Sequence, residues 1–156
     1  MRALVRADFL DGFRQQFDQD RLARFRGDPP AMVPVVAEDP LAPSALPTPD
    51  SWQWFTETGK TRAPNWSNEV TLRSVEMLAE YNPVDYIWQI SPTPLLLLPA
   101  QNDVLTPTHL AIAAFEKARE PKRLEILPGG HFDAYVEGFE ASGNPALAWF
   151  VQHLAP

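Results

Sequence analysis

The chain has 156 residues, of which 45% are hydrophobic and 21% are charged, a composition typical of one globular domain. Its formal net charge of -7 and its lack of clustered Lys and Arg argue against polyanionic partners, so we expect binding to neither nucleic acid nor a membrane surface. The absence of cysteine excludes disulfides, thiolate metal ligands and a cysteine nucleophile.

The amino-terminal sequence does not look like an export signal, because Arg2, Arg6 and Asp8 lie where the apolar stretch of a signal peptide would be. The longest strongly aliphatic run, Leu95 to Leu98, is far shorter than the roughly 20 residues that span a bilayer. We therefore expect a cytoplasmic location and no membrane-spanning segment.

The first part of the chain is predicted to be helical. Residues 8–25 have the spacing of one or two short amphipathic helices, whose apolar stripe comprises Phe9, Leu10, Phe13, Phe17, Leu22 and Phe25. The stretch from Asp28 to Asp50 is rich in proline and is predicted to be irregular, because each proline removes a backbone donor and restricts the preceding residue. The apolar residues in and after this stretch predict a packed flap rather than a solvated linker.

A further helix is predicted before the middle of the chain. Ser67 is the expected N-cap, and Asn82-Pro83 is the expected end. Its apolar face is predicted to comprise Leu72, Val75, Leu78 and Ala79. We place a boundary here: residues 1–82 are predicted to form a helical cap or flap, and residues 83–156 the βαβα part of an α/β fold.

The second part begins with a strand, helix, strand pattern. The strands are predicted at residues 94–100 and 123–127. Between them, Thr106-Pro107 has the pattern of an N-cap and first helical position, and Glu120-Pro121 ends the helix. Such crossovers join parallel strands. A last helix is predicted to start at Asn144-Pro145, with the following residues facing inward: Leu147, Phe150, Val151 and Leu154.

The four consecutive leucines indicate a strand that is covered on both faces and flanked by other strands. Only one flanking strand is clear. Residues 33–37 are another candidate, which Pro34 interrupts. A sheet of two parallel strands has an open edge and is a poor stable unit, so the chain has the features of part of a larger sheet.

An acid and an imidazole follow the two predicted strands. Asp103 comes after the first strand and His131 after the second. Because the carboxyl ends of parallel strands line up, we expect these side chains to lie within hydrogen-bond reach of each other. Gly129-Gly130 favours a sharp turn that delivers His131 into a cleft. The pair is predicted to be a base, His131, oriented by an acid, Asp103.

Other interpretations of these residues remain open. Asp103 could be an Asx-turn residue, and His131 a buried structural histidine. A metal site at Asp103, His131, Asp133 and Glu137 is chemically possible, but no metal-binding spacing is present, so we expect no metal.

The second part resembles the carboxyl-terminal half of an α/β-hydrolase, in which an acid follows the penultimate strand and a histidine the last one. More narrowly, it resembles the polyketide transferase-like and dienelactone hydrolase-like groups over about residues 65–154. The segments that carry this resemblance are 68–74, 91–96, 102–107 and 128–135. It implies a partial α/β-hydrolase fold, with a helical cap before the last βαβα, and it implies that Asp103 is the acid and His131 the general base of a Ser-Asp-His triad.

The chain departs from this family at the nucleophile. None of its serines lies in the G-x-S-x-G sequence that exposes the nucleophile on a strand-to-helix turn. The resemblance implies that the missing elements would lie before Met1. Without nucleophile and oxyanion donors, acyl transfer has no first step, so the chain alone is predicted to be inactive.

Two hypotheses about function follow. The first is an acyl hydrolase or transferase that acts on a small acyl ester or thioester, needs no cofactor and contacts its substrate through Trp52, Trp54, Trp66 and Phe132. These aromatic residues could equally fasten the flap. The second is a non-catalytic half-domain that acts through homo-oligomerisation or through pairing with a missing amino-terminal half.

Overall fold

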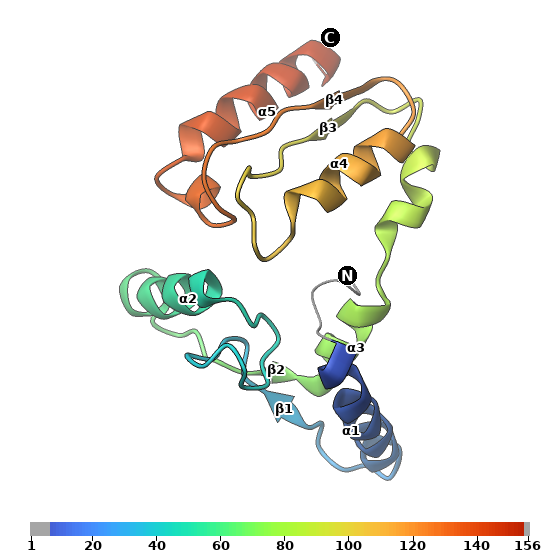
Figure 1. Cartoon of the computed structure of the whole chain (residues 1–156), viewed down its shortest axis with the longest axis vertical. Helices are drawn as coiled ribbons and strands as arrows, with labels where there is room; N and C mark the ends of the chain where they lie inside the picture. Colours follow the sequence, from blue (N-terminus) through green and yellow to red (C-terminus); the bar gives the residue numbers. More distant parts are fainter. Residues whose placement is uncertain (1–6, 155–156) are drawn as a thin grey trace. The chain divides into compact units, whose positions relative to one another are not determined.

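The computed structural model describes the backbone of residues 7–154 and the side chains of residues 14–154. The chain forms two compact units, one of residues 1–82 and one of residues 83–156 (Figure 1). Three residues of the predicted amino-terminal stripe, Phe9, Leu10 and Phe13, lie outside the described side chains. None of the helices in the described range is long and apolar enough to cross a bilayer.

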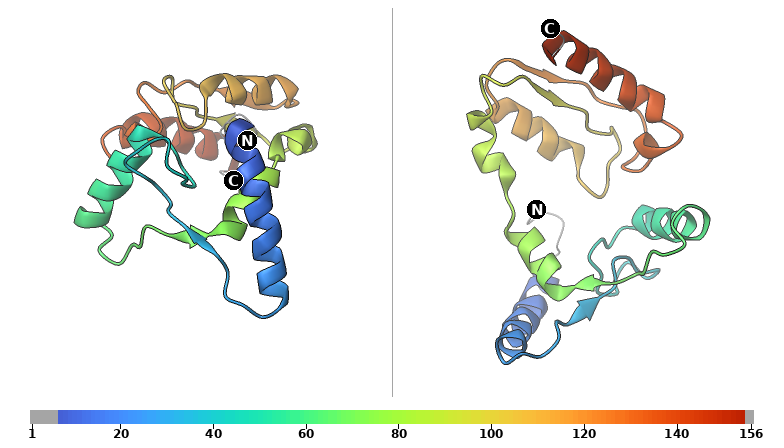
Figure 2. Two further views of the ribbon diagram at one scale, coloured as in Figure 1. Left: turned by 60° about the horizontal axis from the view of Figure 1, so that its bottom comes forward. Right: turned by 180° about the vertical axis from the view of Figure 1, so that it is seen from behind.

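The first unit is organised around helix α1, Ala7–Phe25, which packs against helix α3, Leu72–Glu80 (Figure 2). Phe17 of α1 meets Leu72 and Val75 of α3 in a buried apolar cluster. The other described residues of the predicted stripe are not part of this core, because Leu22 and Phe25 are 55% and 90% exposed. One turn of α1 therefore carries its described apolar contact with α3.

Buried charges accompany this contact. The carboxylate of Glu76 on α3 accepts hydrogen bonds from Arg21, and the carboxylate of Asp20 accepts one from Arg24 at 2.8 Å. Asp20 also accepts the backbone N–H of Ala31 at 2.8 Å. This last bond lowers the pKa of Asp20 below its ordinary value, with further lowering by Arg24. Asp20 thus joins α1 to the segment that follows it.

A short antiparallel pair follows α1. Strand β1, Met32–Val33, pairs with strand β2, Val70–Thr71, so that Met32 lies opposite Thr71. The candidate strand at residues 33–37 is therefore wrong in its bounds and in its place, because β1 pairs within the first unit. Pro34 ends it, since proline has no N–H to donate.

The proline-rich segment is anchored by one amide side chain. Asn68 Oδ1 accepts the backbone N–H of Val36 at 3.0 Å, and Asn68 Nδ2 donates to the Val36 carbonyl at 2.9 Å. The side chain of Asn68 therefore satisfies both backbone groups of a residue that is only 1% exposed. Val36 of this segment is thus buried within the first unit, whereas Met32 is 48% exposed.

One helix of the first unit was not predicted, and another starts later than predicted. Helix α2, Pro49–Thr61, begins at the end of the stretch predicted to be irregular, with Thr48 as N-cap residue and Pro49 in the first turn. Proline is tolerated there because the first N–H groups of a helix have no partner within it. Helix α3 is capped by Thr71, which accepts from Ser74, rather than by Ser67. The β1–β2 pairing keeps Val70 and Thr71 extended up to that cap.

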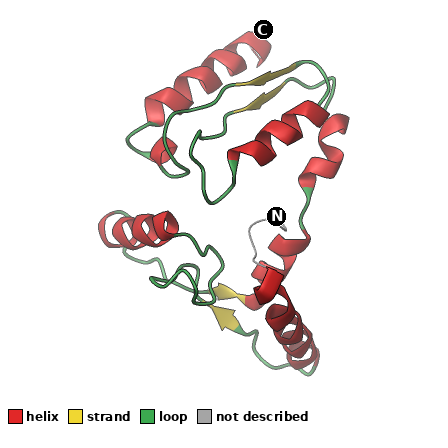
Figure 3. Cartoon of the chain, viewed as in Figure 1, coloured by secondary structure: helices red, strands yellow, loops and turns green. Residues whose placement is uncertain are grey.

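The second unit contains strand β3, Leu95–Leu97, helix α4, Thr108–Lys117, strand β4, Lys122–Leu124, and helix α5, Phe139–Leu154. Short 3-10 helices occupy Pro83–Gln89 and Asp133–Tyr135 (Figure 3). Strands β3 and β4 are parallel, with Leu95 opposite Lys122 and Leu97 opposite Leu124. The predicted βαβ crossover is confirmed, although both strands are shorter than predicted.

The core of this unit lies between β3 and α4. Ala114 and Ala118 pack with Ile87 of the first 3-10 helix, and Leu95 and Leu97 border this cluster. Leu95 to Leu98 are each only partly buried, although the continuous apolar run predicts a strand covered on both faces. The described chain thus covers this strand incompletely.

Helix α5 corrects two predictions. It starts at Phe139, and Asn144 and Pro145 lie inside it rather than at its start, because the helical backbone is already established when Ser142 N bonds Gly138 O at 3.2 Å. The face predicted to be inward is the exposed one. On the opposite face Trp149 is 8% exposed, and the centroid of its ring lies 4.1 Å from the centroid of the His153 ring. The exposed fractions of the outward residues are 63% for Leu147, 56% for Phe150, 58% for Val151 and 73% for Leu154.

Candidate active site

Parallel pairing continues beyond the two strands and aligns the loops that follow them. Ala100 forms a parallel bridge with Leu127, with the same offset as in β3–β4. Gln101 N then donates to Leu127 O at 2.8 Å, and Asn102 N donates to Gly129 O at 2.9 Å. These bonds bring the residues that follow, Asp103 and His131, to the same place at the carboxyl end of the strand pair.

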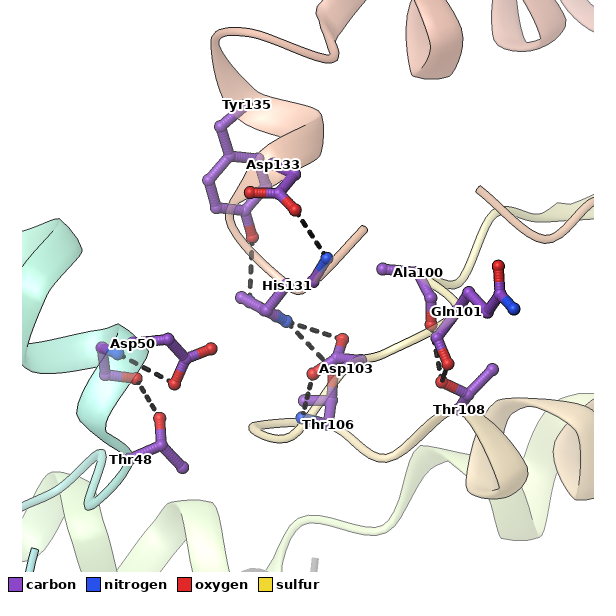
Figure 4. A network of polar contacts seen from close by, with 12 residues as sticks. Thr48, Asp50, Ala100, Gln101, Asp103, Thr106, Thr108, His131, Asp133 and Tyr135 are labelled. Carbon is purple, nitrogen blue, oxygen red and sulfur yellow. Dashed lines mark hydrogen bonds and ion pairs between the residues drawn. The ribbon is translucent and has the colours of Figure 1, made fainter. Parts of the chain in front are cut away.

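Asp103 and His131 contact each other directly, as the crossover predicts. His131 Nδ1 lies 2.8 Å from Asp103 Oδ2 (Figure 4). The side chain of Asp103 is 6% exposed and that of His131 is 20% exposed. A carboxylate can only accept, so Nδ1 carries the proton and donates it to Asp103. In the neutral ring, Nε2 then has no proton, and its lone pair can accept a hydrogen bond.

Thr106 holds the carboxylate on its other side. Its backbone N–H donates to Asp103 Oδ1 at 2.6 Å, and its hydroxyl donates to Asp103 Oδ2 at 2.7 Å. Thr106 is therefore not the helix N-cap, because α4 begins at Thr108 and follows Pro107. The turn that Asp103 makes with Thr106 and its contact with His131 occur together, so the two interpretations of Asp103 are compatible.

The charge state of Asp103 follows from these contacts. Burial of the carboxyl group raises its pKa. The hydrogen bonds from Thr106 and His131, together with the positive charge that His131 can carry, lower the pKa by more than burial raises it. The net effect is a pKa of Asp103 below its ordinary value. The group is therefore a carboxylate that accepts the Nδ1 proton and orients the ring.

The loop before His131 is shaped by Gly129 and Asp133. Gly129 has a φ of 88°, in the left-handed region, and a Cβ built there would lie 2.3 Å from Asp133 Oδ2. That carboxylate accepts the backbone N–H of Gly130 at 2.7 Å. A Cβ added at Gly130 would meet nothing closer than 3.8 Å, so of these two glycines only Gly129 is required by the turn. Asp133 acts as the turn-stabilising carboxylate.

Two aromatic side chains flank the imidazole. The ring of Phe132 meets that of His131 edge to face, with centroids 4.8 Å apart. The hydroxyl of Tyr135 lies 3.0 Å from His131 Nε2, so the second nitrogen also has a partner (Figure 4). Burial and then the negative charge of Asp103 raise the pKa of Tyr135.

Sequence reasoning missed Thr106 and Tyr135. The signal for Thr106 is the spacing of an acid and a hydroxyl residue three positions later, which also describes a turn. No local signal identifies Tyr135.

The three tryptophans predicted to bind substrate lie in the first unit. Phe55 of α2 contacts Trp54 at 5.1 Å and Trp66 at 5.6 Å between ring centroids. Trp66 also covers Gly59, where an added Cβ would approach its ring to 2.8 Å. Trp52 is half-buried on the same helix. These contacts fix α2 to the segment after it, and the predicted role of Trp52, Trp54, Trp66 and Phe132 in substrate binding stays a prediction.

The arrangement around His131 has the chemistry of a general base. Its Nδ1 is tied to a carboxylate, and its Nε2 faces a hydroxyl. Among residues 14–154, the hydroxyls within hydrogen-bond distance of the ring are those of Thr106 and Tyr135, and no serine is among them. Over the same range, no three His, Cys, Asp or Glu side chains are grouped as a metal site would require.

Comparison with known proteins gives a consistent set of relatives. No family model matches the chain. It is 30% identical over 137 residues to polyketide transferase grgF of a Penicillium species, which covers 87% of this chain and 46% of the relative. It is 29% identical over 119 residues to a thiohydrolase of Eupenicillium brefeldianum, covering 74% of this chain and 39% of the relative. The chain thus spans less than half the length of these curated relatives.

A solved structure extends the similarity to three dimensions. The crystal structure of the alpha/beta hydrolase GrgF from Penicillium sp. sh18 superposes with a TM-score of 0.75 at 26% identity. The match covers 94% of this chain and 50% of that one. Nearly all of the chain therefore corresponds to half of a larger fold.

Proposed function

Because the chain has part of the α/β-hydrolase fold, we propose that it supplies the acid and the base of an acyl hydrolase or acyl transferase site. The observation that carries this proposal is the 2.8 Å contact of His131 Nδ1 with Asp103 Oδ2 at the carboxyl end of two parallel strands. Carboxylate and imidazole have this relation in Ser-His-Asp triads on several unrelated folds.

The proposed roles follow from the tautomer. Asp103 accepts the Nδ1 proton, fixes the ring and stabilises the imidazolium that forms when Nε2 takes a proton. His131 takes that proton from an attacking hydroxyl and returns it to the leaving group. Thr106 supports the chemistry indirectly, because its two hydrogen bonds keep Asp103 ionised and aimed at the ring.

The nucleophile is proposed to come from residues outside this sequence. None of the serines here has the glycine pattern of a nucleophile elbow, and none contacts His131 in the described range. A base and an acid without a nucleophile and oxyanion donors cannot begin acyl transfer. The chain alone is therefore proposed to have no acyl-transfer activity.

The proposed substrate is a small acyl ester or thioester. The support for this class comes from relatives named thiohydrolase and polyketide transferase. Thioester cleavage and acyl transfer to an acceptor share the same first step, attack on an acyl carbonyl, so the same base serves both. The acceptor, water or another group, decides between them.

One experiment tests the base in the chain as it exists. Nitrogen-15 NMR of the His131 ring should give a protonated Nδ1 and an unprotonated Nε2, and Asp103→Asn should change that pattern.

Ester and thioester assays complete the test. The chain alone should hydrolyse p-nitrophenyl butyrate no faster than the His131→Ala variant does. Mixing it with the half of the Penicillium polyketide transferase that it does not cover should produce turnover that His131→Ala abolishes. A proton on Nε2, or turnover that His131→Ala leaves intact, would contradict the proposal.

A second candidate function is favoured by helix α5, whose apolar stripe is exposed at Leu147, Phe150, Val151 and Leu154. We propose that this face is covered by a complementary polypeptide corresponding to the other half of the solved relative, since this chain accounts for only 50% of that structure. The chain would then be a non-catalytic half-domain that acts by association. Mass measurement in solution tests this when the chain is mixed with the half of the solved relative that it does not cover. A complex of the two would support the proposal, self-association of the chain alone would identify a second copy as the occupant, and a chain that stays monomeric in the mixture would contradict association.

A further inference from the structure

The hydroxyl of Tyr135 is placed where the proposed chemistry needs a proton donor. Its oxygen lies 3.0 Å from His131 Nε2, on the opposite side of the ring from Asp103. Tyr135 belongs to the 3-10 helix Asp133–Tyr135, directly after the histidine loop. Its ring meets the His131 ring edge to face at 5.7 Å and the Phe132 ring at 5.8 Å. Both nitrogens of His131 thus have a partner.

The direction of this hydrogen bond follows from the other side of the ring. Asp103 has a lowered pKa and is ionised, so it accepts the proton of Nδ1. Nε2 of the neutral ring then has a lone pair and no proton, and it can only accept. The Tyr135 hydroxyl therefore donates to Nε2. A hydroxyl that donates its proton to Nε2 has the geometry that an attacking alcohol has before proton transfer.

We propose that Tyr135 is a positioning residue of this site, whose hydroxyl occupies the proton-accepting position of His131 until a reacting hydroxyl displaces it. The inference rests on the proposed role of His131 as base. Tyr135 fixes the tilt of the imidazole from one side as Asp103 fixes it from the other. It also gives Nε2 a hydrogen-bond partner within the chain.

The burial of Tyr135 suits such an exchange. The residue is 51% exposed, so about half of its surface faces solvent although its ring contacts those of His131 and Phe132. Asp103, in contrast, is nearly buried and is held by three hydrogen bonds, so it stays in place. The site therefore combines one fixed partner of the imidazole with one exchangeable partner.

The test uses Tyr135→Phe, which keeps the ring and removes only the hydroxyl. The rate at which diethylpyrocarbonate modifies His131 is measured by mass spectrometry at one fixed, mildly alkaline pH. Loss of the hydrogen bond should raise this rate about fivefold, the factor that corresponds to a net hydrogen-bond contribution of about 1 kcal/mol. The nitrogen-15 resonance of Nε2 should also move toward the position of a nitrogen that accepts no hydrogen bond, while the Nδ1 proton stays in place.

Two controls separate this effect from a general loosening of the fold. His109 is exposed on α4 and serves as an internal reference, whose modification rate should not change. Tyr86→Phe removes a hydroxyl from a tyrosine that is 66% exposed, and it should leave both the rate and the resonance of His131 unchanged. Equal His131 rates and equal Nε2 resonances in Tyr135→Phe and the parent chain would overturn the inference. These readouts need no turnover, so they fail or succeed independently of the acyl-transfer proposal.

Discussion

Thr106 donates hydrogen bonds to both carboxylate oxygens of Asp103, from its backbone N–H to Oδ1 and from its hydroxyl to Oδ2. The residue that a helix-start pattern assigns to α4 thus belongs to the acid of the candidate site. Its hydroxyl also lies 3.2 Å from His131 Nδ1, so it touches both members of the pair.

The first prediction concerns the Thr106 hydroxyl. Thr106→Val keeps the shape and the backbone donor but removes the hydroxyl donor, so the pKa of Asp103 should rise toward its ordinary value. The variant should lose about 1.5 to 3 kcal/mol of stability, the range for a hydrogen bond to a charged group. NMR titration of the Asp103 carboxyl and a urea melt measure the two effects. Thr108→Val is the matched control, because its hydroxyl bonds the carbonyls of Ala100 and Gln101 and does not touch Asp103.

The second prediction concerns pH and stability. The pKa of Asp103 is lowered in the folded chain, so its contribution to stability is fully present above the ordinary carboxyl pKa of about 3.9 and is lost as the pH falls through the lowered pKa. Asp20 has a lowered pKa as well and adds to the same acid sensitivity. Urea melts at neutral and acidic pH should show Asp103→Asn less stable than the parent at neutral pH, with a difference that shrinks in acid. A difference that stays constant would contradict the lowered pKa of Asp103.

The third prediction compares two neighbouring glycines. Gly129→Ala should destabilise the second unit by about 1 to 2 kcal/mol, the cost of a left-handed residue with a side chain, and the clash with Asp133 adds to this. The variant should also weaken the His131 to Asp103 contact, visible as loss of the Nδ1 proton signal. Gly130→Ala is the control, because the added methyl meets nothing closer than 3.8 Å. Equal melts for the two variants would show that the turn does not depend on Gly129.

The fourth prediction concerns the exposed stripe of α5. The double change Leu147→Ser and Val151→Ser should reduce any self-association or binding of a complementary half, with little effect on the melt of the chain alone, since both residues are more than half exposed. Trp149→Ala on the opposite face should instead cost about 3 to 5 kcal/mol, as for other buried aromatic residues. Sedimentation and thermal melts distinguish the two faces. Unchanged association in the double variant would remove the stripe as the contact surface.

The sequence predicts the crossover and the meeting of Asp103 with His131, because both follow from the parallel register of two strands and need no knowledge of the rest of the chain. It does not predict α2 or the true start of α5. At Pro49 the number of prolines in the preceding stretch conceals a helix start, and at Pro145 a helix-start pattern lies inside a helix that has already begun.

The burial of α5 could not be read from its pattern either. An apolar stripe at helical spacing predicts that something covers that face, but the pattern does not say whether the cover belongs to the same chain. Tyr135 has no sequence signal, because its meaning depends on which nitrogen of His131 the carboxylate has already taken.

Lys122, the first residue of β4, lies at the end of the strand pair that is far from the candidate site. Its ammonium group donates to the carbonyls of Phe115 and Ala118 at 2.8 and 2.7 Å and lies 4.4 Å from the centre of the Phe115 ring. The strand is thereby fastened to the end of α4 at its first paired residue, which lies opposite Leu95. A slip by one residue would turn every side chain of β4 to the other face and carry His131 away from Asp103. A lysine at the opposite end of the strand thus helps to hold the strand whose register brings the imidazole to the acid.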